Sequence, residues 1–149
     1  MKQSIKHLLL ILLVGTFYVS TAQKPTDAKL PVDSKVKIGK LANGLTYYIR
    51  KNVEPKNRAE LRLVVNAGST LETEKQRGLA HFVEHMCFNG TKNFKKQELV
   101  DFLEKSGVNF GADLNAYTSF DETVYELQVP TDSPMVYKKA MQVLEDWAH

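Results

Sequence analysis

Cysteine is almost absent from this sequence of 149 residues, which contains only Cys87. A single cysteine forms no internal disulfide bond and supplies too few thiolates for a typical closed structural zinc site. On a helix, a residue two positions after His85 points away from it, so we interpret Cys87 as a small buried apolar side chain. Disulfide scaffolds and cysteine-rich zinc folds are therefore excluded.

An excess of charge of one sign is also lacking. The 20 Lys and Arg residues nearly balance the 17 Asp and Glu residues, for a formal net charge of +3. A chain with this balance has no electrostatic footprint for nucleic acid, so we expect no nucleic-acid partner.

The chain has no apolar run of the ~20 residues that a membrane-spanning helix needs. A shorter, mostly apolar stretch covers residues 8–19, after Lys2 and Lys6 and before small residues that end at Ala22. This order is typical of a secretory signal peptide over residues 1–22. We expect an exported protein, periplasmic or secreted, with no stable membrane anchor after cleavage; an uncleaved anchor is the alternative.

His81 and His85 are the most informative residues that are present, because they lie four positions apart with Glu84 directly before the second. On an α-helix, residues at this spacing lie one turn apart on one face, so both imidazoles can reach one metal ion. A catalytic zinc leaves a coordination position for water and makes that water more acidic. Glu84 can accept its proton without being a ligand. This order of residues inverts the common His-Glu-x-x-His motif and is that of the inverzincins.

The residues around the motif are apolar nearly all round the expected helix: Leu79, Ala80, Phe82, Val83, Met86 and Phe88. Such a helix is expected to be buried, and buried imidazoles and carboxylates need partners. Metal binding satisfies both histidines at once. Hydrogen-bonded core histidines and a surface helix with solvated histidines are the alternatives.

Two segments resemble the pitrilysin/insulinase family of zinc metallopeptidases. Residues 78–86, followed by Phe-Asn-Gly-Thr at 88–91, look like the family's active-site helix. Residues 111–118, with Asp121, Thr123 and Tyr125, resemble its Asn-Ala-x-Thr strand. The similarity runs from about residue 36 to the last residue and extends in particular to the bacterial periplasmic branch.

The resemblance implies that His81 and His85 bind one Zn²⁺ per catalytic domain and that Glu84 is the general base. It implies a third ligand, a glutamate on a later helix beyond His149, and a homologous second half that closes a chamber. It therefore implies a zinc metalloendopeptidase acting on oligopeptides or unfolded proteins. This chain would be an N-terminal fragment of it, poorly active or inactive alone.

The resemblance also places Asn115, Ala116 and Thr118 beside the active site as substrate-binding residues. If their strand is a sheet edge, an extended peptide could pair with it through main-chain hydrogen bonds. The alternative is an interior strand pair with no substrate contact.

Periodicity and turn residues predict an α+β fold, an antiparallel-rich mixed sheet with helices packed on it. Residues 23–34 have the composition of a polar linker, and 35–149 form the N-terminal part of a metallopeptidase domain, truncated at its C-terminus. An Asn-Gly pair predicts a hairpin of strands 36–38 and 45–49. Further strands are expected at 61–65, 115–117 and 123–129, and helices at the motif, at 97–105 and from 133 onward.

Three residues near the C-terminus, Glu145, Asp146 and His149, offer other metal-ligating groups. The apolar residues around them predict an ordinary amphipathic helix: Met135, Ala140, Met141, Val143, Leu144 and Trp147. We therefore interpret the three as a solvated helix face.

Two other functions are compatible with the fold. One is a non-catalytic subunit or peptide-binding module, whose usual mark is a broken motif, whereas the motif here is intact. The other is a structural zinc protein, which the lone cysteine disfavours.

Overall fold

The computed structural model describes residues 29–109 and 111–149, so the expected signal peptide lies outside the described residues. The chain divides into two compact units, residues 1–51 and 52–149. Within the described residues, no helix is both long enough and apolar enough to cross a membrane. The predicted signal peptide, linker and domain bounds stay predictions.

The first unit contains an antiparallel hairpin of β1 (Val36–Lys40) and β2 (Thr46–Arg50). Gly44 in the turn has a φ of +96°, a conformation that glycine adopts without steric cost. The N–H of Leu41 donates to the carbonyl of Leu45 at 2.8 Å and closes the turn. The hairpin predicted from the Asn-Gly pair is confirmed.

The second unit is built on a three-stranded antiparallel sheet in the order β3 (Arg58–Val65), β5 (Thr123–Pro130), β4 (Leu114–Thr118). The central strand β5 is the most deeply buried of the three. At one end of the sheet, Thr123 on β5 lies opposite Thr118 on β4. The described sheets are antiparallel throughout, which confirms the predicted α+β class.

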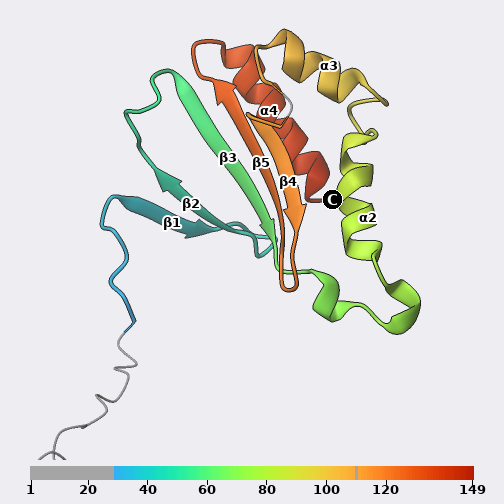
Figure 1. Ribbon diagram of the computed structural model, residues 1–149. Helices are drawn as coiled ribbons and strands as arrows, with labels where there is room; N and C mark the ends of the chain where they lie inside the picture. The colour runs from blue at the N-terminus through green and yellow to red at the C-terminus, as the bar shows by residue number, and fades with distance from the viewer. Residues whose placement is uncertain (1–28, 110) are drawn as a thin grey trace, which may run out of the picture. The chain divides into compact units, whose positions relative to one another are not determined.

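Three helices accompany this sheet: α2 (Leu79–Phe88), α3 (Glu98–Lys105) and α4 (Pro134–Trp147). Two short 3₁₀ helices, η1 (Ser69–Leu71) and η2 (Glu74–Gln76), connect β3 to α2. Figure 1 shows α2 beside β4 and α4 behind the sheet, against β5. The predicted helices and strands are therefore present, each with ends shifted by a few residues.

The hydrophobic core lies between α3, α4 and the sheet. Its fully buried side chains are Leu99, Leu103, Val108, Leu114, Leu127, Val129 and Val143. Helix α4 contributes one face, made of Val136, Ala140, Val143 and Trp147. Met135 and Met141 are 64% and 45% exposed, so the prediction that they share this face was wrong. The buried residues follow three- and four-residue steps along the helix, and positions 135 and 141 are not on that series.

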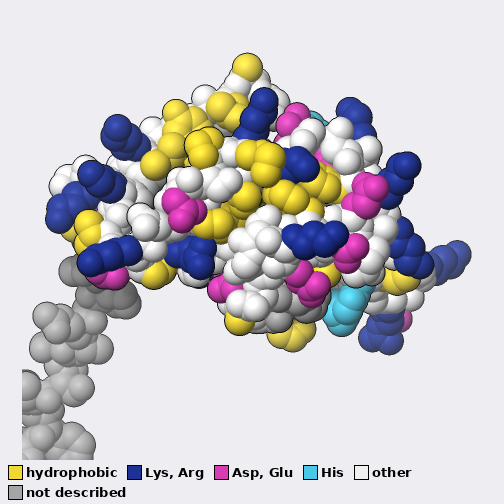
Figure 2. Space-filling view, turned by 90° about the horizontal axis from the view of Figure 1, so that it is seen from above, with side chains coloured by type: hydrophobic (Ala, Val, Ile, Leu, Met, Phe, Trp, Pro, Cys, Tyr) yellow, Lys and Arg dark blue, Asp and Glu magenta, His cyan; other side chains and the backbone are white. Residues whose placement is uncertain are grey.

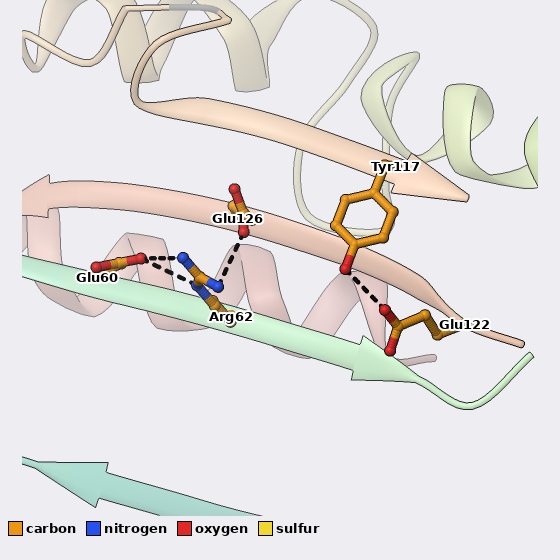
Figure 3. Close-up of polar contacts among 5 residues, drawn as sticks. All are labelled: Glu60, Arg62, Tyr117, Glu122 and Glu126. Carbon is orange, nitrogen blue, oxygen red and sulfur yellow. Dashed lines mark hydrogen bonds and ion pairs between the residues drawn. The ribbon is translucent and has the colours of Figure 1, made fainter. Parts of the chain in front are cut away.

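The opposite face of the sheet carries several charged and polar side chains. Arg62 on β3 bonds to Glu60 and pairs with Glu126 on β5 at 3.3 Å, and Tyr117 on β4 donates to Glu122 at 2.8 Å (Figure 3). The hydrogen bond with Glu60 and the charges of the two carboxylates raise the pKa of Arg62. Charges of both signs also lie among apolar side chains on the face seen in Figure 2, in keeping with the balanced composition.

Helix α2 is less buried than its sequence predicts. Phe82 is 60% exposed and Val83 is 50% exposed, and Glu84 is the one residue of α2 classed as buried. One side of α2 packs against β4 and β5, while Leu79 and Met86 on the rest of its surface are also 44% and 43% exposed. The prediction of burial all round was therefore wrong for the described part of the chain.

Candidate active site

Helix α2 brings His81 and His85 together at its surface. Their Nε2 atoms lie 3.0 Å apart, and their ring centroids lie 4.6 Å apart. Both side chains are exposed, and the one-turn spacing places them on the same face of the helix. Two imidazole nitrogens thus face the same point in space.

Glu84 completes this group from the buried side of α2. It is 6% exposed, and one ligand atom from each of His81, Glu84 and His85 lies within 4.8 Å of the other two. Among the described residues, this is the one cluster of three or more His, Cys, Asp or Glu side chains with metal-binding geometry.

The two histidines fit a zinc ion. Nitrogen atoms that bind one zinc tetrahedrally at ~2.1 Å lie roughly 3.4 Å apart. The observed 3.0 Å between the Nε2 atoms of His81 and His85 needs only a small outward rotation of the rings to reach that spacing. Imidazole is also a ligand that zinc prefers.

A hydrogen bond from the neighbouring strand holds the carboxylate of Glu84. The hydroxyl of Thr118, the last residue of β4, donates to Oε2 of Glu84 at 2.7 Å. Thr123, opposite Thr118 on β5, donates its hydroxyl proton to the carbonyl of Ala67 at 2.9 Å. The strand pair therefore meets the motif helix through a side-chain contact that the sequence did not predict.

Glu72 secures the start of α2. Its carboxylate accepts the N–H groups of Gly78 and Ala80, each at 2.7 Å. These bonds lower the pKa of Glu72, since they favour its charged form. Gly78 has a φ of +83°, which lets the chain turn into the helix. The sequence-based prediction did not include Glu72. A carboxylate a few residues before a glycine at an expected helix start could have indicated this role.

The end of α2 is secured by the core. The indole N–H of Trp147 donates to the carbonyl of Cys87 at 3.0 Å, and Sγ of Cys87 lies 3.3 Å from the hydroxyl of Tyr125. Burial and this contact with Cys87 raise the pKa of Tyr125. Cys87 packs against the core but is half-buried rather than fully buried, so the predicted burial is met only in part.

The prediction that Asp146 lies on a solvated helix face was wrong. Its carboxylate accepts bonds from the hydroxyl of Thr91 and from both the backbone and side-chain nitrogens of Asn93, at 3.0 and 2.6 Å for Asn93. Burial raises its pKa, but these bonds together outweigh burial and lower it. Asp146 therefore ties α4 to the loop after α2, and a local helix pattern cannot reveal a contact made 55 residues away.

The three residues predicted to contact substrate lie on β4, which pairs with β5 alone among the described residues and so forms an edge there. Ala116 and Thr118 are half-buried on the side of the sheet that faces α2. The side chain of Asn115 lies on the opposite side, because neighbouring residues of a strand alternate. The structure therefore does not bring the three side chains together at one point.

Residues 47–149 match the sequence profile of the family described as Insulinase (Peptidase family M16). This chain belongs to that family. The matched range contains the sheet, the three helices and the cluster of His81, Glu84 and His85, so the resemblance drawn from the motifs is confirmed.

Relatives of this insulinase-family chain are zinc proteases. The probable zinc protease PqqL of Haemophilus influenzae is 40% identical over 139 residues, which are 93% of this chain and 15% of that protein. The crystal structure of the periplasmic protease PqqL from Escherichia coli matches 82% of this chain and 14% of that one, with 42% identity and a TM-score of 0.78. A structure of the first half of the same protease has the same TM-score, and 26% of it is covered. The chain thus spans about a seventh of the length of the full-length relatives.

Proposed function

We propose that this chain carries the zinc-binding and proton-transfer residues of a metalloendopeptidase, a longer protein of which it forms the N-terminal part. The observation that carries the proposal is the convergence of His81, Glu84 and His85 within 4.8 Å. Membership of a family with zinc-protease relatives supports it. The substrates in this proposal are oligopeptides or unfolded proteins.

In this proposal each residue of the cluster has its own role. His81 and His85 hold Zn²⁺ through their Nε2 atoms, and a glutamate beyond His149 is the third ligand. A bound zinc supplies Lewis acidity, which makes a water molecule more acidic and polarises a peptide carbonyl. Glu84 accepts the water's proton and passes it to the leaving amine nitrogen.

We propose that substrate binds along the edge strand β4. Asn115, Ala116 and Thr118 would bind an extended peptide mainly through their backbone, as one more antiparallel strand. The edge position of β4 and its packing against α2 support this arrangement. Backbone recognition suits an enzyme that accepts many peptide sequences.

We further propose that the longer protein is exported and that a homologous second half closes a chamber over the site. The signal-like residues 1–22 and the periplasmic location of a relative support export. A relative whose first half has been crystallised separately supports a two-half organisation.

Zinc content and peptide cleavage of the longer protein test the proposal, with Glu84→Gln beside the wild type. We expect about one zinc per protein in both. We expect Glu84→Gln to lower kcat by roughly a hundred- to ten-thousand-fold, because the general base is lost. This chain alone serves as a comparison, and we expect it to be poorly active because it lacks the third ligand.

Two outcomes would contradict the proposal. A wild-type protein that binds peptide without cleaving it would be a non-catalytic, peptide-binding module on the same fold. Unfolding of the protein when a chelator removes zinc would indicate a structural ion.

A further inference from the structure

Thr118 makes a contact that a substrate-binding role does not require. Its hydroxyl lies 2.7 Å from Oε2 of Glu84, whose side chain is 6% exposed. We propose that Thr118 is a positioning residue, which holds the carboxylate of Glu84 in the orientation that accepts a proton. This inference rests on the proposed peptidase function.

The hydroxyl groups of Thr118 and Thr123 near Glu84 each already donate their proton to another group. Thr118 has one hydroxyl proton, and it donates that proton to Glu84. Thr123 has one as well and donates it to the carbonyl of Ala67 at 2.9 Å, so its 3.4 Å approach to the Thr118 hydroxyl supplies no second bond to Glu84. While Thr118 bonds to Glu84, it has no proton left to donate to a substrate carbonyl.

The donor is held more firmly than a loop residue would be. Thr118 is paired with Thr123 at the end of the β4 and β5 ladder, and β4 packs against α2. A β-branched side chain also has few allowed rotamers. Strand β4 therefore fixes the position of Oε2 of Glu84 through Thr118. In this proposal Oε1 of Glu84 accepts the proton of the water molecule.

Loss of this bond should slow the reaction without weakening substrate binding. A buried carboxylate oxygen without a donor costs free energy and lets the carboxylate rotate away from the reactive position. A hydrogen bond to a charged group corresponds to roughly a ten- to hundredfold effect on rate. We expect the effect to appear in kcat, because the bond from Thr118 acts on the general base, Glu84, rather than on the peptide.

Substitutions at position 118 in the longer protein test the proposal. Thr118→Val replaces the hydroxyl by a methyl group of similar size, and Thr118→Ser keeps the hydroxyl. We expect Thr118→Val to lower kcat by about ten- to a hundredfold at unchanged KM and zinc content, and Thr118→Ser to recover most of the activity. Thr70→Val is the matched control, since it removes a threonine hydroxyl whose bonds go to the carbonyl of Phe120 and the carboxylate of Asp121.

A double-mutant cycle tests whether Thr118 acts through Glu84 or independently of it. Adding Thr118→Val to Glu84→Gln should lower the residual kcat no further. A readout without turnover is thermal unfolding of the zinc-free protein, in which Thr118→Val and Glu84→Ala should shift Tm non-additively.

Four outcomes would overturn the positioning role. They are a rise in KM at constant kcat, loss of zinc, additive effects in the cycle, and a Thr118→Val enzyme as active as the wild type. If Thr118→Val does not fold, Thr118→Ser and the cycle with Thr118→Ala carry the test. Failure of the proposed function looks different, because the wild type itself would then not cleave peptide.

Discussion

At the scale of single residues, the site depends on carboxylates whose oxygens are already hydrogen-bonded by the protein. Glu84 is buried and accepts a bond from Thr118, whereas Glu72 accepts two backbone N–H groups at the start of α2. Such donors stabilise a carboxylate that is partly or fully removed from water, because they replace the hydrogen bonds to water that it has lost. The same bonds fix the direction in which each carboxylate points.

Replacement of Glu72 tests this view of α2. We expect Glu72→Ala to lower Tm and to weaken zinc binding, because the turn that leads to His81 loses the acceptor of two N–H groups. Calorimetry of unfolding and competition with a zinc chelator would measure the two effects. Glu74→Ala is the control, since Glu74 makes only an exposed contact with Arg77 at 3.5 Å. Equal effects of the two substitutions would contradict the prediction.

At the scale of elements, α2 is held from both ends and from one side. Glu72 bonds to its start, Trp147 of α4 bonds to the carbonyl of Cys87 near its end, and Thr118 of β4 contacts it from the side. Asp146 of α4 then ties down the loop that follows. A metal site on a single helix needs this support, because two ligands one turn apart keep their geometry only if the helix stays regular.

The contact between α4 and the loop is open to a direct test. Asp146→Ala should destabilise the fold by about 2 kcal/mol, since the bonds from Thr91 and Asn93 are lost. Denaturant unfolding measures this difference. Glu145→Ala is the control, because Glu145 is the exposed neighbour and should change stability little.

The same contact predicts a pH dependence. The pKa of Asp146 is lowered below its usual 3.8 in the folded state, so the unfolded state binds the proton more readily. The stabilisation that the Asp146 carboxylate contributes is therefore complete above about pH 3.8. It is lost as the pH falls through the lower pKa of Asp146 in the folded state. The stability difference between wild type and Asp146→Ala should shrink in acid, and a difference that grows there would contradict the assignment.

At the scale of the whole molecule, the hydrophobic core and the histidine cluster are separate. The fully buried side chains come from α3, α4, the loop before β4 and the sheet, and none comes from α2. We therefore expect folding of the described second unit not to require a metal ion, unlike that of small zinc-dependent domains.

Metal removal tests this separation in the longer protein. A chelator should abolish peptide cleavage while the far-UV circular dichroism spectrum stays unchanged, and added zinc should restore activity. Tm should fall only by the amount that ligand binding contributes. Global loss of the circular dichroism signal on chelation would show that the ion supports the fold.

Prediction from the sequence worked best where the signal is local. The one-turn spacing of His81 and His85 and the Asn-Gly hairpin depend on residues a few positions apart, and both were predicted. The burial of α2 was predicted wrongly, because an apolar helix surface does not say which of its sides is covered. Asp146 was assigned to solvent for a similar reason, since its partners lie in a distant loop.

The sequence by itself determined the inverted zinc motif, the α+β class and the order of the elements, because these depend on residue type and on short-range periodicity. Only the tertiary structure decided that β4 is an edge in the described chain and that Thr118 reaches Glu84. Residues 84 and 118 are brought together by the packing of α2 on β4, and a contact over that separation depends on the whole fold rather than on either segment.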